Sequence, residues 1–151
     1  MSKKKLTLKI SEPLTSEEFG AYFLLRYNIL RKPWNKPFGS EKDEQENECI
    51  HIIASNENKE ILGVCRLQFN SKEEAQIRFM AVLEEFRGNN VGRKLLDYAE
   101  KKSKSKGAKK VILHARSTAV NFYKKCNYSE VEKSYLMWGE IQHYLMQKQI
   151  V

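Results

Sequence analysis

The stretch that decides the fold is residues 76–128, QIRFMAVLEEFRGNNVGRKLLDYAEKKSKSKGAKKVILHARSTAVNFYKKCNY. It begins within an apolar run, residues 75–83, which predicts a buried strand. A glycine-bearing loop, RGNNVGR at residues 87–93, separates this strand from a helical spacing of apolar residues that ends near Gly107. A second apolar run follows at residues 111–115. The order strand, loop, helix, strand predicts a right-handed crossover between two parallel strands.

The loop at residues 87–93 has the features of an anion-binding site. Where a strand leads into a helix, the first backbone N–H groups of the helix point at one spot, at the positive end of the helix dipole. Gly88 and Gly92 let the backbone approach an anion closely, and Arg87 and Arg93 add positive charge. We expect a phosphate or pyrophosphate there. The spacing matches neither the P-loop nor the dinucleotide-binding fingerprint, so an ordinary turn stays an alternative on these residues alone.

The flanking sequence predicts a mixed α/β sheet with helices on both faces. Thr15 or Ser16 can cap a helix that stops before Pro33, and an irregular loop follows to residue 48. Ser117 or Thr118 is expected to cap another helix. Short turns join three strands in the first half, which favours antiparallel pairing. The predicted strands are residues 6–10, 49–55, 61–69, 75–83, 111–115, 128–137 and 143–150.

Length and composition indicate one globular domain, residues 1–151. Hydrophobic residues make up 41% and aromatics 11%, which excludes a wholly disordered chain. There is neither an apolar run of the roughly 18 residues that span a membrane nor a signal-peptide pattern, so we expect a cytoplasmic protein. Cys49, Cys65 and Cys126 lack the spacing of a disulfide framework, and no metal site is expected.

The charge is unevenly distributed. There are 27 Lys and Arg against 19 Asp and Glu, a net +8, and residues 87–110 hold nine bases against two acids. Such a surplus favours an anionic partner, which could be nucleic acid or a small polyanion such as a nucleotide cofactor. A nucleic-acid-binding module is therefore an alternative function. The lysines have no interleaved aromatics on which bases could stack, as expected of a solvated face, so no nucleic-acid partner is predicted.

Residues 76–128 resemble the core of the GNAT superfamily of N-acetyltransferases. The family pattern is an apolar strand, a pyrophosphate loop written Arg/Gln-x-x-Gly-x-Gly/Ala, a helix, a short strand and a second helix with an Asn and a Phe-Tyr pair. The matching residues here are 87–92 and 121–123. The segment RYNILRKPWNKPFGSEKDE at residues 26–44 resembles small bacterial acetyltransferases of the ElaA/YjcF-like type. Two asparagines, Asn90 and Asn127, replace usual glycines, and Asn tolerates the left-handed backbone best among the other residues.

The resemblance implies a GNAT-type mixed, mostly antiparallel sheet with a splayed parallel pair, between whose strands acetyl-CoA lies. It implies that backbone groups of the first splayed strand and an Asn of the second helix hold the pantetheine arm, and that the loop holds the pyrophosphate. The implied cofactor-binding residues are Met80, Ala81, Val82, Arg87, Gly88, Asn89, Asn90, Val91, Gly92, Arg93 and Asn121.

The activity that the resemblance implies is transfer of an acetyl group from acetyl-CoA to a primary amine of a small molecule or protein, by direct attack in a ternary complex. Tyr123 would be the general acid for the departing thiolate, since a phenol of pKa about 10 is protonated at pH 7. A Tyr packed on an amphipathic helix is the alternative. The Val82 N–H would bind the oxyanion. An ammonium of pKa about 10.4 must lose a proton first. The candidate bases are Glu48, His51, Glu84 and His114.

The acceptor side is expected to be formed by the first helix and the loop after it. Arg26, Arg31 and Trp34 could bind an acidic or aromatic acceptor, and a solvated helix face is the alternative interpretation. His143 is a further candidate near the site. Because Asn90 departs from the family pattern, a CoA-binding sensor without catalysis is a second alternative function. No membrane partner is expected, and a homodimer is left open.

Overall fold

The computed structural model describes residues 7–151. Its chain divides into two compact units, each made of two separate segments. The N-terminal unit is Met1–Leu67 with Phe79–Ala99, and the C-terminal unit is Gln68–Arg78 with Glu100–Val151. The chain therefore crosses from one unit to the other three times, and neither unit is a continuous piece of sequence.

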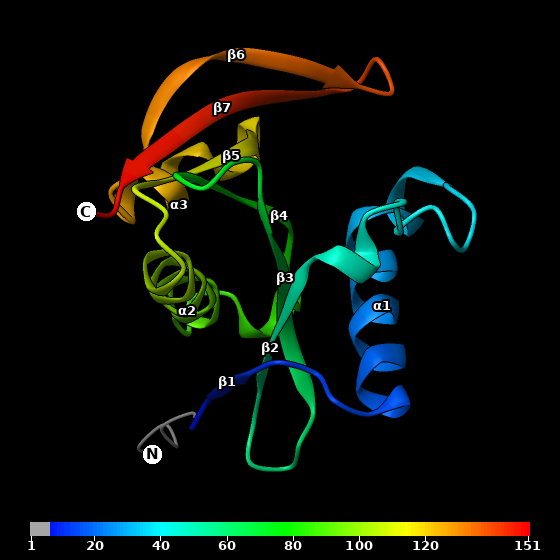
Figure 1. Ribbon diagram of the computed structural model, residues 1–151. Coiled ribbons are helices and arrows are strands. Elements are labelled where there is room, and N and C mark those ends of the chain that lie inside the picture. Colours follow the sequence, from blue (N-terminus) through cyan, green and yellow to red (C-terminus); the bar gives the residue numbers. More distant parts are fainter. Residues whose placement is uncertain (1–6) are drawn as a thin grey trace, which may run out of the picture. The chain divides into compact units, whose positions relative to one another are not determined.

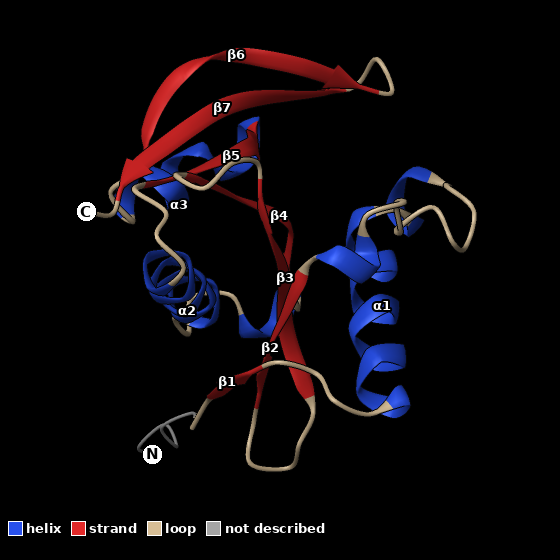
Figure 2. Cartoon of the chain, viewed as in Figure 1, coloured by secondary structure: helices blue, strands red, loops and turns tan. Residues whose placement is uncertain are grey.

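The seven strands form one mixed sheet in the order β1-β2-β3-β4-β5-β7-β6. Figure 1 labels the strands, and Figure 2 colours them red. Only β4 and β5 are parallel among the pairs whose register is known, while β1–β2, β2–β3, β5–β7 and β6–β7 are antiparallel. This confirms the predicted fold class. The strands are β1 Lys9–Ser11, β2 Ile50–Ser55, β3 Ile61–Phe69, β4 Glu74–Val82, β5 Lys110–Arg116, β6 Ser129–Met137 and β7 Ile141–Gln149, and the helices are α1 Ser16–Leu30, α2 Val91–Ser105 and α3 Val120–Lys125.

The first strand differs from its prediction. It was expected at residues 6–10, but β1 begins at Lys9 and ends at Ser11, and Leu6 lies outside the described residues. Its register with β2 pairs Lys9 with Ser55 and Ser11 with Ile53. Pairing with the neighbouring strand, rather than the local alternation of apolar residues, sets these ends.

In the N-terminal unit, α1 begins where the sequence predicts. The Thr15 side chain accepts a hydrogen bond from the Glu18 backbone N–H at 3.1 Å, and Glu18 accepts one from the Thr15 N–H at 3.3 Å. This capping box satisfies two groups at the start of the helix. The helix ends at Leu30, before Pro33, and its inner side packs on the sheet through a core of Tyr22, Leu25, Leu30, Ile53, Val64 and Ala81.

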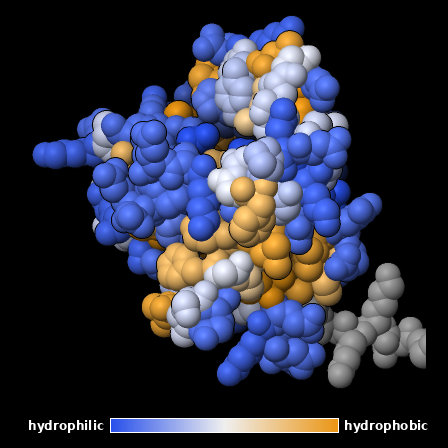
Figure 3. Space-filling view, turned by 90° about the vertical axis from the view of Figure 1, so that its right-hand side faces the viewer, coloured by the Kyte–Doolittle hydropathy of each residue, from blue (hydrophilic) through white to orange (hydrophobic). Residues whose placement is uncertain are grey.

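The outer side of α1 is apolar in part. In Figure 3, orange side chains gather on the side of the N-terminal unit that carries α1. Leu24 of the helix and Leu14 just before it are exposed. The helix is thus not a simple amphipathic one, although its inner side alone forms the core described above. None of the helices within residues 7–151 has the length and apolar character needed to cross a membrane.

On the other side of these strands, α2 packs closely on β3 (Figure 1). A Cβ atom at Gly63 of β3 would lie 2.8 Å from Val91 Cγ1 and 3.1 Å from Leu95 Cδ1. A side chain at residue 63 would push the helix away from the strand, because real Cβ atoms do not approach so closely. The glycine therefore determines how the first turns of α2, which follow the loop of residues 87–90, rest on the sheet.

In the C-terminal unit, α3 ends as predicted but starts differently. Asn127 adopts φ 71°, and the Tyr128 N–H donates to the Tyr123 carbonyl at 3.0 Å, so Asn127 ends the helix as a left-handed residue. The expected cap by Ser117 or Thr118 is wrong. These residues belong to a 3₁₀ turn, and α3 begins only at residue 120, with no side-chain cap. Ser117 and Thr118 are residue types preferred at a helix N-cap, but here they form the 3₁₀ turn that precedes the helix.

Candidate active site

The loop between β4 and α2 adopts the backbone that an anion-binding turn needs. A 3₁₀ turn, Glu84–Phe86, precedes it, and the Arg87 N–H donates to the Glu84 carbonyl at 3.2 Å. Gly88 then has φ 86° and Asn90 has φ 63°. Asn90 thus takes the left-handed conformation for which the family pattern uses glycine. The turn survives the replacement, as the sequence predicts.

The start of α2 presents unbonded backbone donors. The first hydrogen bond into the helix runs from the Lys94 N–H to the Asn90 carbonyl at 3.0 Å. Among the described residues, nothing accepts a hydrogen bond from the N–H groups of four residues at this end, and three cations of the same segment are exposed. These donors and charges suit a group with several anionic oxygens. The four residues are Gly88, Asn90, Val91 and Gly92, and the cations are Arg87, Arg93 and Lys94.

The strand before this loop has an unusual backbone. Phe79 has φ 55° in the middle of β4, a conformation that a bulky residue rarely adopts. It immediately precedes the predicted pantetheine-binding segment, in which Ala81 is buried and Met80 and Val82 are half-buried. In the C-terminal unit, the parallel register of β4 with β5 runs from Glu74–Lys110 to Ile77–Leu113. Strand β5 ends at Arg116, and β4 ends at Val82, in the N-terminal unit.

Helix α3 of the C-terminal unit carries the other two predicted site residues. Asn121 is exposed, and the side chain of Tyr123 is buried. The Tyr123 ring lies edge-on to Tyr128, with centroids 5.9 Å apart. The Tyr128 hydroxyl donates to Glu100 at 2.9 Å, and burial followed by the charge of Glu100 raises the pKa of Tyr128. The roles predicted for Asn121 and Tyr123 stay predictions.

The two histidines among the candidate bases differ in their free atoms. His51 uses both ring nitrogens, since Nδ1 lies 2.8 Å from the Tyr22 hydroxyl and Nε2 lies 2.7 Å from the Glu46 carbonyl. A carbonyl only accepts, so Nε2 carries the proton that bonds the Glu46 carbonyl. His114 engages only Nδ1, at 3.0 Å from Ser134 Oγ, and its Nε2 has no partner within residues 7–151. Both ring nitrogens of His51 are therefore occupied, which indicates a structural role for this residue.

His114 and the other candidate residues differ in burial and in their charged neighbours. Burial lowers the pKa of His114, with a smaller contribution from the charge of Arg78. Glu48 and Glu84 are exposed at the surface of 3₁₀ turns. His143 is buried, and its ring stacks on Tyr135 with centroids 4.3 Å apart. A proton acceptor needs a neutral ring with one nitrogen that has no hydrogen-bond partner, and His114 meets both conditions.

The comparison with known proteins decides the family. Residues 15–128 match the Acetyltransferase (GNAT) family. The chain belongs to this family. It is an acetyltransferase by homology, and the predicted resemblance is confirmed.

Individual relatives agree with the subgroup. The chain is 30% identical to the uncharacterized N-acetyltransferase YjcF of Bacillus subtilis over 132 residues, which are 87% of this acetyltransferase and 93% of YjcF. It is 36% identical over 76 residues to the uncharacterized N-acetyltransferase CT2212 of Chlorobaculum tepidum, a match that spans 50% of this chain and 48% of that protein.

Solved structures share the fold at lower identity. Escherichia coli ElaA superposes with a TM-score of 0.77 at 22% identity, covering 95% of this chain and 99% of ElaA. An aminoglycoside 6'-N-acetyltransferase solved in complex with coenzyme A superposes with a TM-score of 0.79 at 18% identity, covering 95% and 97%. The ElaA/YjcF-like type of small bacterial acetyltransferase is therefore the group that this chain resembles.

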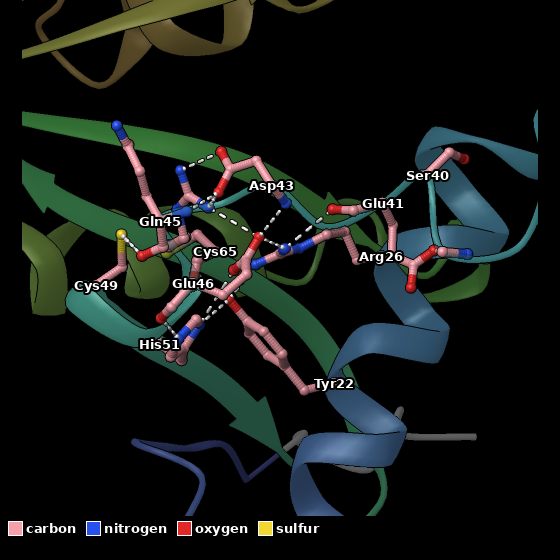
Figure 4. Close-up of polar contacts among 12 residues, drawn as sticks. Tyr22, Arg26, Ser40, Glu41, Asp43, Gln45, Glu46, Cys49, His51 and Cys65 are labelled. Carbon is pink, nitrogen blue, oxygen red and sulfur yellow. Dashed lines mark hydrogen bonds and ion pairs between the residues drawn. The ribbon is translucent and has the colours of Figure 1, made fainter.

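The N-terminal unit of this acetyltransferase also contains a buried ionic cluster (Figure 4). Arg26 and Arg66 are fully buried. Glu46 Oε2 accepts hydrogen bonds from Nη1 of both guanidiniums, at 2.9 Å and 2.8 Å, and Asp43 holds Arg66 through two bonds of 2.6 Å and 2.8 Å. We call Arg26, Arg66, Asp43 and Glu46 the ionic cluster. It anchors the loop that follows α1 to the helix and to β3.

The solvated helix face considered for the first helix is therefore wrong. Arg26 and Arg31 are buried, and Arg31 Nε donates to the Ser40 carbonyl at 3.0 Å, while Trp34 is half-buried. A signal for this was present, because Arg26 falls in the helical spacing of apolar residues and Arg66 lies in the middle of an apolar strand. A charge at a core position implies an opposite charge nearby, which the acidic run at residues 41–48 supplies.

Proposed function

We propose that this protein transfers the acetyl group of acetyl-CoA to a primary amine, of a small molecule or a protein, in a ternary complex. The observation that carries the proposal is the loop that leads into α2, where the N–H groups of Gly88, Asn90, Val91 and Gly92 are unbonded and Gly88 and Asn90 are left-handed. Family membership and a similar fold solved with coenzyme A support the same cosubstrate. A sensor that binds CoA without turnover is the second candidate, and a measurement of turnover with amine acceptors separates the two.

The cosubstrate is held by backbone groups and surface cations in this proposal. The pyrophosphate sits on the loop and the first turn of α2, and the pantetheine arm binds the end of β4 and an Asn of α3. The pyrophosphate-binding residues are Arg87, Gly88, Asn89, Asn90, Val91, Gly92 and Arg93, and the pantetheine-binding residues are Met80, Ala81, Val82 and Asn121.

The reaction needs one proton acceptor and one proton donor. The ammonium of the acceptor first gives a proton to a base, and the amine nitrogen then forms a bond to the thioester carbon. The Val82 N–H stabilises the resulting oxyanion. The carbon–sulfur bond breaks as the intermediate collapses, and the thiolate takes a proton from Tyr123. The nitrogen then gives up one of its two protons, which restores the Tyr123 hydroxyl, and the amide product keeps the other.

We assign the base to His114. It is the one histidine among the candidates with a ring nitrogen that no described residue occupies, and Nδ1 is oriented by Ser134. If Nδ1–H donates to Ser134 Oγ, Nε2 carries the lone pair that accepts the amine proton. The charged and titratable groups around the ring are Arg78 on β4, Tyr135 on β6 and, stacked behind Tyr135, His143 on β7.

The pH dependence tests this assignment. The pKa of His114 lies below its ordinary value of 6.5, so the neutral, active form prevails at pH 7 and is lost as the pH falls below 6.5. We expect kcat/KM to show an acidic limb in that range. The variant His114→Gln should lose the limb and about 10²-fold of kcat/KM. His143→Gln is the control and should keep the limb. A limb that persists in His114→Gln removes the assignment.

Thermal unfolding with acetyl-CoA tests the cosubstrate. At a concentration about 100 times its Kd, a ligand adds roughly 2.7 kcal/mol to the free energy of unfolding, or about 5–10 °C in Tm for a chain of this size. We expect this shift for the wild type. The variant Gly88→Val should lose it, because a β-branched residue strains the left-handed backbone at φ 86°.

Gly139→Val is the matched control for the loop variant. Gly139 also has a positive φ, 70°, and open space around its Cβ position, but it lies in the turn between β6 and β7. This variant should retain the full shift. If acetyl-CoA does not shift the wild type while a short oligonucleotide does, the acetyltransferase proposal fails and the nucleic-acid alternative replaces it.

A further inference from the structure

Phe79 combines a bulky side chain with a left-handed backbone. Its φ is 55°, inside a strand whose neighbours are extended. For a residue with a large side chain this conformation costs free energy, and it persists only where the surroundings hold it. Such positions concentrate at functional sites, so the contacts of this side chain identify what holds it.

Three guanidinium groups surround the Phe79 ring. The Cζ atoms of Arg26, Arg66 and Arg31 lie 4.3 Å, 4.8 Å and 5.7 Å from the ring centroid. A guanidinium over an aromatic face is attracted by the ring quadrupole, and more strongly where water is excluded. All three arginines are buried. The ring also packs against the core that α1 forms with the sheet.

The arginines are themselves held in place. Glu46 Oε2 binds both Arg26 and Arg66, Asp43 binds Arg66, and the Glu41 carbonyl accepts from Arg26 Nη1 at 3.1 Å. A buried guanidinium that left these carboxylates would lose its charge partner in a medium where few others exist. Glu46 and Asp43 therefore fix the guanidiniums of Arg26 and Arg66, while Arg31 donates to the carbonyls of Ser40 and Leu30 at 3.0 Å each. Together the three guanidiniums fix the ring.

The backbone conformation of Phe79 affects the residues that follow it in β4. The peptide bond between Phe79 and Met80 takes its direction from the Phe79 dihedral angles, and this direction sets where the N–H and C=O groups of residues 80–82 point. We infer that Phe79 is a positioning residue, whose ring, clamped by three arginines, orients the β4 backbone that binds the pantetheine arm of acetyl-CoA. This inference rests on the proposed function, because it assigns the binding role to residues 80–82.

The test compares the ring with an apolar side chain of similar size. In Phe79→Leu the cation–π contacts disappear, and the backbone is free to relax to an extended conformation. We expect the Kd for CoA, measured by titration calorimetry, to rise about tenfold, as for one lost hydrogen bond. Phe79→Tyr keeps the aromatic face and should bind CoA within about twofold of the wild type. Retained affinity in Phe79→Leu, or a tenfold loss in Phe79→Tyr, overturns the inference.

Leu25→Ala separates positioning from stability. Leu25 is buried in the same core as Phe79, lies on α1, and is not one of the proposed CoA-binding residues. Its variant should lose at least as much Tm as Phe79→Leu and keep the wild-type Kd for CoA. An equal loss of CoA affinity in both variants would show that Phe79 is only structural. Absence of CoA binding by the wild type would instead refute the proposed function, so the two failures are distinguishable.

Discussion

Replacing Tyr123 by Phe is expected to lower kcat by about 10²–10⁴-fold, because the departing thiolate loses its proton donor. The ring keeps its edge-on contact with Tyr128, at a centroid separation of 5.9 Å, and the backbone hydrogen bonds at the end of α3 use the Tyr123 carbonyl. The Kd for acetyl-CoA should therefore change by no more than about twofold. Steady-state kinetics with a free-thiol readout and calorimetry with CoA measure the two quantities.

Tyr128→Phe is the matched control for this experiment. It removes a hydroxyl from the adjacent ring, but that hydroxyl binds Glu100, which also pairs with Lys148 at 2.7 Å. We expect a loss of about 1–3 kcal/mol in the free energy of unfolding and an unchanged kcat. Unchanged turnover in Tyr123→Phe would exclude Tyr123 as the acid. Binding of CoA by the wild type with no turnover of any amine would favour the sensor.

Replacing Glu46 by Ala is expected to destabilise the protein by about 3–5 kcal/mol. The substitution leaves two fully buried guanidiniums, Arg26 and Arg66, without the carboxylate oxygen that they share. Asp43 still pairs with Arg66, but the Arg26 guanidinium keeps only hydrogen bonds to uncharged oxygens, those of the Glu41 carbonyl and the Tyr22 hydroxyl. Chemical denaturation measures the free energy, and Tm should fall by roughly 6–20 °C.

Glu48→Ala provides the control within the same 3₁₀ turn. Glu48 lies two residues further on and is exposed, so its removal should change the free energy of unfolding by about 0.5 kcal/mol or less. If Glu46→Ala does not fold, Glu46→Gln keeps an acceptor oxygen without the charge and should show a smaller loss in the same direction. Equal stability of the residue 46 and residue 48 variants would contradict the role of the ionic cluster.

Much of the fold could be predicted from local patterns. The strand at residues 61–69, the cap at Thr15 and the helix that begins at Val91 lie where spacing and capping chemistry place them. The left-handed asparagines were also predictable, since Asn90 and Asn127 stand where the family pattern has glycine. Each of these features depends on residues within a few positions of one another, which is why sequence alone reveals them.

Other features could not be predicted because several local solutions compete. Ser117 and Thr118 are good caps, yet they lie in a 3₁₀ turn and α3 starts after them. His51 and His114 both follow apolar strand residues, and only the contacts of their ring nitrogens distinguish a structural histidine from a candidate base. Local sequence preference does not distinguish His51 from His114, or a helix cap from a 3₁₀ turn at Ser117 and Thr118. The packing of segments that are distant in the sequence decides between them.

The sequence by itself determined the order of the elements, the family and the loop at residues 87–93, because these follow from short-range spacing and backbone preference. The tertiary structure alone decided that Arg26 and Arg66 share Glu46 in the interior and that their guanidiniums enclose Phe79. These residues lie up to 53 positions apart in the chain, between Arg26 and Phe79. Burial makes each charge depend on its partners, so only the folded chain reveals which residues meet.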